Sequence, residues 1–220
     1  MKPTLETFEE IFKEANHNKR NVWGIKRFDT LLDKYPEFRK NEEMLHRLGL
    51  MYDHVFFKDR AKQKPYEDKA ISIYKAILKI NPNSYKATWG IGRVWWHRKN
   101  KKALPYVLAA YELISKTKDP AAPKGLYTQN VGMIYEMLGD VRKAEQWYKK
   151  GIKVTPEDWG VYLNIISFYH RKKTVIKAKP FLPKYEQLLK KEPREFFDTA
   201  WGKQVLDLLE GTRKIIKEGA

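Results

Sequence analysis

The residue types that most often catalyse reactions or bind metals are few in this sequence. It has 220 residues, no cysteine and five histidines, which are His17, His46, His54, His97 and His170. His46 and His54 lie eight residues apart, too far for one helical turn to chelate a metal, and there is no His-Glu-x-x-His motif. The absence of cysteine excludes disulfides, thiolate metal sites and cysteine nucleophiles. We therefore predict no metal site at these histidines.

Two further patterns match catalytic motifs only in part. Gly90-Ile91-Gly92 begins like a dinucleotide-binding loop, but no strand pattern precedes it and the third glycine is missing. Paired acids such as Glu9-Glu10 lie at predicted helix starts, where the helix dipole accounts for them without an acid–base pair. The sequence has no Walker loop and no serine elbow. We expect a protein that is not an enzyme, has no catalytic residues and needs no cofactor.

Basic side chains are better suited to bind a partner. The 44 lysines and arginines exceed the 27 aspartates and glutamates, so the chain carries a formal charge of +17 at pH 7. A field of this sign attracts polyanions, anionic lipid headgroups and acidic peptides, but it says nothing about the fold. Two basic runs, residues 97–102 and 170–173, could form a surface for such partners.

Helices are the elements that must position these side chains. Apolar residues recur at helical spacing almost throughout, as at Leu5, Phe8, Ile11 and Phe12, and alternating strand patterns are absent. Helix breakers follow at short intervals, namely Pro36, Asn81-Pro82-Asn83, Pro120, Gly139-Asp140, Pro156 and Pro193. About eleven helices of roughly 12–20 residues fit between them.

No segment is suited to a membrane or to export. The N-terminal sequence turns polar before the apolar region of a signal peptide could form, and no stretch approaches roughly 18 uninterrupted apolar residues. We therefore expect a soluble, unsecreted protein without a transmembrane segment, and a cytoplasmic location by default.

A repeat of 34 residues relates two neighbouring segments. When residues 125–158 are aligned with residues 159–192, three identical residues coincide: Asn130 with Asn164, Tyr135 with Tyr169, and Ala144 with Ala178. Thirty-four residues is the length of one helix–turn–helix unit. The first segment has the order Tyr127, Asn130-Val131-Gly132, Tyr135, Gly139-Asp140, Ala144, Tyr148, Gly151 and Pro156. This order resembles the tetratricopeptide repeat, and weaker copies surround Gly49 and Gly92.

The resemblance implies an all-α fold, a right-handed superhelical solenoid of antiparallel helix pairs with a C-terminal capping helix. Residues 1–193 would form about five helical hairpins, clearest in 125–158 and 159–193, and residues 194–220 the capping helix and tail. Three local expectations accompany it. Gly132 would face the small Ala144 where their helices cross. Extra residues near 56–67 would lengthen a first helix and its turn, with Lys62 in that turn, and one helix would follow Pro193.

In repeats of this family, the first helix of each pair lines a concave groove that binds peptides. The side chains carried over by position are cationic, amidic or aromatic: Arg47, Lys86, Trp89, Arg93, Trp96, Gln129, Asn130, Met133, Asn164, Ser167 and Arg171. Asn130 and Asn164 match an asparagine that hydrogen-bonds the ligand backbone in peptide-binding members, although asparagine there is also common consensus. The cations could hold acidic groups of the peptide.

The resemblance also puts the two basic runs in equivalent turns between paired helices, two repeats apart. They would form a basic edge of Arg98, Lys99, Lys101, Lys102, Lys172 and Lys173. Such an edge could bind nucleic-acid phosphates. The alternative is that turns are solvated and carry lysine for that reason alone.

Three functions are open at this point. The first is a non-enzymatic adaptor or scaffold that binds an acidic or amphipathic segment of a protein partner in the groove. The second is a nucleic-acid-associated, RNA-binding helical repeat that uses the basic edge. The third is a purely structural repeat that needs neither surface.

Overall fold

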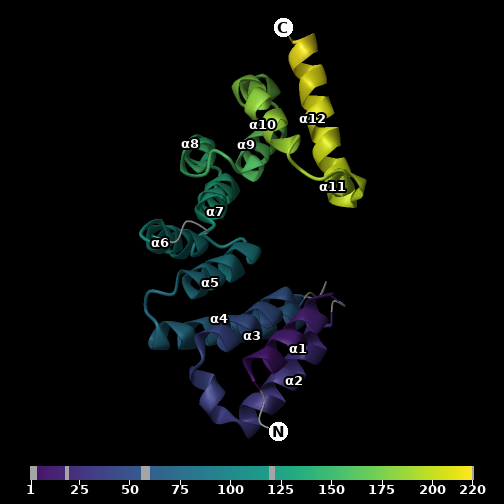
Figure 1. Cartoon of the computed structure of the whole chain (residues 1–220). Helices are drawn as coiled ribbons and strands as arrows, with labels where there is room; N and C mark the ends of the chain where they lie inside the picture. The colour runs from purple at the N-terminus through teal and green to yellow at the C-terminus, as the bar shows by residue number, and fades with distance from the viewer. Residues whose placement is uncertain (1–3, 18–19, 56–59, 119–121, 220) are drawn as a thin grey trace. The chain divides into compact units, whose positions relative to one another are not determined.

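The computed structural model describes residues 4–17, 20–55, 60–118 and 122–219, and in these ranges every regular element is helical. The ranges contain twelve α-helices and two 3₁₀-helices, in which neighbours along the chain form antiparallel pairs (Figure 1). The all-α prediction is confirmed. The helices divide between an N-terminal unit, residues 1–118, and a C-terminal unit, residues 119–220. Within the described residues, no helix is both long enough and apolar enough to cross a membrane.

The N-terminal unit contains three helix pairs. They are α1 (Leu5–His17) with α2 (Asn21–Lys34), α3 (Glu42–His54) with α4 (Arg60–Ile80), and α5 (Tyr85–His97) with α6 (Ala103–Ser115), and the 3₁₀-helix η1 (Pro36–Lys40) follows α2. The apolar sides of α1 to α5 share one core, in which Phe8, Phe28 and Tyr74 are fully buried. Because a single helix pair leaves an apolar face uncovered, the pairs are stable only when stacked.

The C-terminal unit begins with α7 (Lys124–Met137) and α8 (Val141–Val154). After them α9 (Trp159–Arg171) packs against the 3₁₀-helix η2 (Val175–Phe181) and α10 (Leu182–Leu189), and α11 (Arg194–Asp198) precedes α12 (Ala200–Glu218). Pro180 lies inside η2 and Pro183 in the first turn of α10, which explains why the second helix of this pair is divided. Tyr148, Tyr169 and Tyr185 are the largest buried side chains of this unit's core.

Capping side chains fix where several helices begin. Asn41, Ser84 and Asp140 each accept a hydrogen bond from the backbone N–H three residues further on, at the starts of α3, α5 and α8. These side chains satisfy N–H groups that have no partner inside the helix, and each stabilises its helix start by about 1 kcal/mol.

The turns after α5, α7 and α9 share one backbone conformation. Their left-handed residues are Lys99 (φ +50°), Gly139 (φ +82°) and Lys173 (φ +55°). The residue that follows donates its N–H five residues back, from Asn100 to Trp95, Asp140 to Tyr135 and Thr174 to Tyr169. This is the common glycine-ended helix terminus, and a lysine in it carries a steric cost of roughly 1–2 kcal/mol. The two basic runs therefore do lie in equivalent turns.

The small residues at the helix crossings face tyrosine rings. A Cβ on Gly132 would meet the ring of Tyr148 first, from 3.0 Å, rather than the small Ala144 that was predicted to face it. In the N-terminal unit, a Cβ on Gly90 would lie 2.5 Å from the ring of Tyr74. These glycines make room for a bulky ring on a neighbouring helix.

Two expectations about helix ends are corrected. α3 ends at His54, and the extra residues lengthen α4, the second helix of the pair, so Lys62 lies in the first turn of α4 instead of the loop. Residues 56–59 of the insertion lie outside the described residues. Two helices follow Pro193 where one was expected, because Thr199 adopts an extended conformation and caps α12 by accepting a hydrogen bond from Gly202 N–H.

Candidate functional site

Helix α5 carries four of the predicted groove residues on one face. Lys86, Trp89, Arg93 and Trp96 follow at intervals of three, four and three residues, which is the spacing of a single helix face, and all four are partly exposed. The opposite side of α5, including Ile91, is buried in the unit. The apolar side anchors the helix, so the four residues form a fixed surface that we name the α5 face.

A buried ion pair holds Arg93 in this face. Its guanidinium contacts the carboxylate of Asp53 on α3, which is fully buried, while the Arg93 side chain is 16% exposed. His97 lies on the other carboxylate oxygen, with Nδ1 3.6 Å from Oδ1. Burial by itself would raise the pKa of Asp53, but the neighbouring His97 imidazole and the charge of Arg93 hold it below its usual value. Asp53 is thus ionised at neutral pH and fixes Arg93 in place.

The same part of the unit contains three of the five histidines. Burial, with the nearby charge of Lys86, lowers the pKa of His46 to about 4, and burial with the charge of Arg93 lowers the pKa of His54. Both imidazoles are therefore neutral at pH 7. In the part of the chain that the structure describes, no three His, Asp or Glu side chains lie close enough together to hold a metal ion.

Arg47 on α3 is also engaged within the unit. Its guanidinium contacts Glu9 on α1, lies 3.2 Å from Glu43 and stacks 5.0 Å from the centre of the Phe12 ring. Lys86 approaches the same Glu43, with Nζ 3.4 Å from the carboxylate. Arg47 therefore joins α1 to α3. Lys86 shares Glu43 with Arg47 and is the more exposed of the two cations.

In the C-terminal unit, Arg171 on α9 forms an ion pair that corresponds to the pair of Arg93 with Asp53. Its Nε and Nη2 donate to the two carboxylate oxygens of Glu136 on α7, at 3.0 and 2.9 Å. Lys172 lies 3.3 Å from the same carboxylate, and Tyr148 Oη donates to it at 3.1 Å. Burial would raise the pKa of Glu136, but the hydrogen bond and charge of Arg171 lower it overall. Glu136 therefore binds the two cations that were predicted to meet a ligand.

A common arrangement connects these pairs. An arginine on the first helix of one pair binds an acid on the first helix of the preceding pair: Arg47 with Glu9, Arg93 with Asp53, and Arg171 with Glu136. Asp53 and Glu136 each lie four residues after the glycine of their repeat. The arginines expected to bind a peptide thus hold neighbouring pairs together.

The predicted amide and thioether residues of the C-terminal unit lie on α7 and α9. Gln129 donates to the sulfur of Met133 at 3.8 Å, and Met133 packs against the unit's core. Asn130 is only 6% exposed, and its Nδ2 has no hydrogen-bond partner among the described residues. Asn164 and Ser167 are half-buried on α9.

The residues of the predicted basic edge differ in their surroundings. Arg98 binds Glu67 at 2.7 Å and Asp68 at 2.6 Å, and Lys172 binds Glu136 as described above. The Lys102 ammonium lies 5.0 Å from the centre of the Trp95 ring. Lys99, Lys101 and Lys173 are exposed and have no ion-pair partner among the residues described. Of the basic edge, these three lysines and Lys102 therefore have no acidic partner among the described residues.

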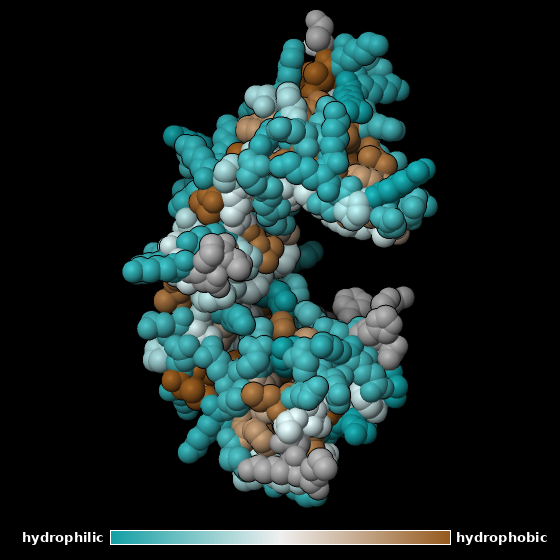
Figure 2. All heavy atoms as spheres, in the orientation of Figure 1, coloured by the Kyte–Doolittle hydropathy of each residue, from teal (hydrophilic) through white to brown (hydrophobic). Residues whose placement is uncertain are grey.

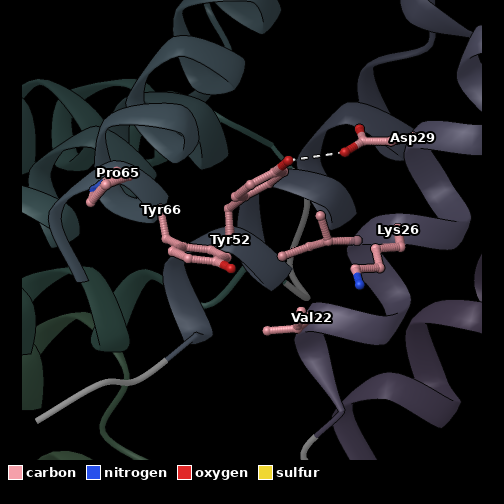
Figure 3. A pocket seen from close by; sticks show the side chains of 7 residues that line it. Val22, Lys26, Asp29, Tyr52, Pro65 and Tyr66 are labelled. Atoms are coloured by element: carbon pink, nitrogen blue, oxygen red, sulfur yellow. Dashed lines mark hydrogen bonds between the residues drawn. The ribbon is translucent and has the colours of Figure 1, made fainter. Parts of the chain in front are cut away.

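A cavity that no sequence pattern indicated lies on another side of the N-terminal unit. It has a volume of about 300 Å³ and lies between α2, α3 and the first turns of α4 (Figure 3). Tyr52 and Tyr66 line it with ring centroids 6.0 Å apart, and Tyr52 Oη donates to Asp29 at 3.0 Å. None of the predicted groove residues borders this cavity. The lengthened start of α4, with Pro65 and Tyr66, supplies one wall.

Solved structures share this arrangement of helices. TTC0263, a thermophilic TPR protein of Thermus thermophilus, is 17% identical and matches with a TM-score of 0.63 over 74% of this chain and 80% of its own. PilF of Pseudomonas aeruginosa is 11% identical and matches with a TM-score of 0.60 over 97% of this chain and 90% of its own. The chain has the tetratricopeptide-repeat fold. Another structural match is MamA of Desulfovibrio magneticus, 15% identical, with a TM-score of 0.58 over 85% of this chain and 96% of that one.

Sequence comparison gives a more distant relation. No protein-family model matches the sequence. The RNA polymerase-associated protein CTR9 of Caenorhabditis elegans is 25% identical over 134 residues, which is 61% of this chain but 11% of CTR9. The tetratricopeptide-repeat chain therefore corresponds to a small part of that relative.

Proposed function

We propose that this tetratricopeptide-repeat chain is a non-enzymatic adaptor that binds an extended, amphipathic or acidic segment of another protein. The observation that carries the proposal is the α5 face. Trp89 and Trp96 are partly exposed seven residues apart, on either side of an arginine that a buried carboxylate holds. Tryptophan and arginine are the residue types that most often dominate protein-binding energy. A surface that is already ordered also loses little entropy on binding.

Apolar side chains of the bound segment would lie on the two tryptophans. Its carboxylates would meet Lys86 and the exposed lysines of the following turn, Lys99 and Lys101. The pair between Lys86 and Glu43 supports this assignment, since both side chains are nearly half exposed and such pairs contribute little in water. Lys86 can therefore exchange Glu43 for a ligand carboxylate. Arg47 and Arg93 are positioning residues in this proposal.

The C-terminal unit would, by itself, bind a peptide in a different way. Gln129, Met133, Asn164 and Ser167 offer amide, thioether and hydroxyl groups on α7 and α9, and the Nδ2 of Asn130 is a donor without a partner among the described residues. Amide side chains are suited to hydrogen bonds with the backbone of an extended peptide. We place the adaptor in the cytoplasm, as the sequence suggests.

Nucleic-acid binding through the basic edge is the second candidate. The exposed lysines Lys99, Lys101 and Lys173 favour it, and the ion pairs of Arg98 and Lys172 reduce the charge available to phosphates. If this candidate is correct, affinity falls steeply with salt, by roughly one log–log unit for each neutralised phosphate.

An affinity capture from the source extract separates the two. The purified chain, a Trp89→Ala/Trp96→Ala variant and a Lys75→Ala control on α4 are compared with and without nuclease, at about 50 and about 300 mM salt. The adaptor proposal predicts a protein that survives nuclease and salt, is retained by the control and is lost by the tryptophan variant. Capture that collapses with nuclease and salt supports nucleic acid, and capture unchanged by the tryptophan variant contradicts the α5 face.

A further inference from the structure

We propose that α12 pairs with α12 of a second copy of this chain, in antiparallel orientation, to form a dimer. The helix has two apolar sides. Gly202, Val205, Leu209 and Thr212 are buried against the C-terminal unit. A second set at intervals of seven, three and four residues, Trp201, Leu208, Gly211 and Ile215, is named here the α12 stripe. The first side completes the fold. Of the second, Leu208 packs against the unit's core from its edge, while Trp201 and Ile215 are exposed.

The α12 stripe is more exposed than the fold requires. Trp201 is 50% and Ile215 39% exposed, and Leu208 is only partly buried. In Figure 2, apolar atoms reach the surface between hydrophilic side chains at the C-terminal end of this helix. Trp201, Leu208 and Ile215 recur every seven residues over about 21 Å, which is the repeat that lets two helices interlock along a seam.

Gly211 gives an independent indication. A glycine inside a helix destabilises it relative to alanine. In this structure a Cβ on Gly211 would have nothing within 4 Å, so no contact inside the described chain requires the glycine. A second helix crossing the stripe at this point would require it, because glycine lets two backbones approach closely.

Charges beside the stripe specify the occupant as a second copy. Asp207 and Lys214 lie seven residues apart on the flank of the stripe that faces away from the unit's core. If two α12 helices pair antiparallel about a two-fold axis that passes between Glu210 and Gly211, Asp207 of each copy comes opposite Lys214 of the other. Asp207 has no ion-pair partner within the described residues, and Lys214 has only an exposed pair with Glu218 at 3.9 Å.

The charge of the whole chain does not prevent this pairing. Between Ala200 and Glu218 the helix carries four basic residues (Lys203, Arg213, Lys214 and Lys217) and three acidic ones (Asp207, Glu210 and Glu218), against a formal charge of +17 for the chain. The helix itself is therefore almost neutral, and in a two-fold contact each favourable pair occurs twice.

Sedimentation velocity of the full chain from about 1 to about 200 µM tests the proposal. The mass is expected to rise from 26.2 kDa toward twice that value with concentration. Trp201→Glu/Ile215→Glu should raise the dissociation constant about tenfold or more. Val141→Glu, at another exposed apolar residue of the same unit, is the matched control and should leave it unchanged. Circular dichroism confirms that each variant is folded.

A charge exchange tests the orientation. Asp207→Lys and Lys214→Asp should each weaken the dimer about threefold or more, and the double variant should restore it, because the opposite charges meet again with their signs reversed. Gly211→Ala should raise the melting temperature of the dilute protein and weaken the dimer. A chain that remains at 26.2 kDa at the highest concentration overturns the proposal. Dimerisation unaffected by the stripe variant, or equally affected by Val141→Glu, also overturns it.

Discussion

Replacing Arg93 by leucine should destabilise the N-terminal unit strongly. The variant leaves the fully buried Asp53 carboxylate without its guanidinium partner, and removing one member of a buried pair costs about 3–5 kcal/mol. His97 still lies 3.6 Å from the carboxylate, so we expect the lower end, about 3 kcal/mol. Because the leftover charge causes the loss, Asp53→Leu/Arg93→Leu should recover most of it.

The measurement is urea unfolding at pH 7, followed by circular dichroism, for wild type, both single variants and the double variant. Arg171→Leu is the matched control, since it removes the same kind of pair where the arginine is half exposed, and it should cost about 1 kcal/mol. A loss for Arg93→Leu no larger than that of the control would refute the reasoning. A double variant as unstable as Arg93→Leu would refute it too.

The pH dependence of the free energy of unfolding gives a second test that the buried charge of Asp53 is the cause. In the wild type the pKa of Asp53 is lowered on folding, so its stabilisation is present above about pH 4 and is lost as the pH falls through the folded value. In Arg93→Leu, the buried Asp53 carboxylate no longer has the Arg93 charge beside it, so burial raises its pKa. As the pH falls, Asp53 becomes protonated and the cost of its buried charge disappears from the variant. The stability difference between wild type and variant should therefore narrow from pH 7 toward pH 4. A constant difference would contradict the buried charge as the cause.

Further substitutions test the turns and the helix crossings. Lys99→Gly should raise the free energy of unfolding by about 1 kcal/mol, because Lys99 has a φ of +50° that glycine adopts without steric cost. Lys101→Gly, in the same turn, is the control and should give no such gain. Equal effects of the two variants in thermal unfolding would disprove the steric explanation. Gly90→Ala should lower that free energy by about 2 kcal/mol, because its Cβ would lie 2.5 Å from the Tyr74 ring. A Gly90→Ala variant as stable as the wild type would show that the Tyr74 ring moves aside, against this expectation. Gly211→Ala, measured in dilute protein, should raise the free energy of unfolding by about 0.5–1 kcal/mol.

Much of the fold could be predicted because its signals are local. The 34-residue period identified the repeat, and the breakers at Gly139 and Pro156 marked helix ends. The insertion was misassigned since propensity does not say which helix of a pair takes extra residues. The break at Thr199 was missed because apolar spacing continues across it, and only the cap on Gly202 N–H reveals a new start.

The candidate site was harder to predict, since its chemistry depends on pairs between repeats. The sequence marked Arg93 and Arg171 as cations in a groove, but their acids lie 40 and 35 residues earlier, at Asp53 and Glu136. The position four residues after the repeat glycine is a signal that could have found both acids. Burial of those acids, which decides whether the arginines are available to a ligand, follows only from packing.

Site-specific crosslinking tests the central claim most directly. A photo-reactive amino acid is placed at Lys86, beside the α5 face, or at Ser72, an exposed position on α4, and the chain is irradiated in its own cells. Our account predicts a protein adduct from position 86 that is absent from position 72 and lost in Trp89→Ala/Trp96→Ala. Equal adducts from both positions, or an adduct at 86 that persists without the tryptophans, would contradict it.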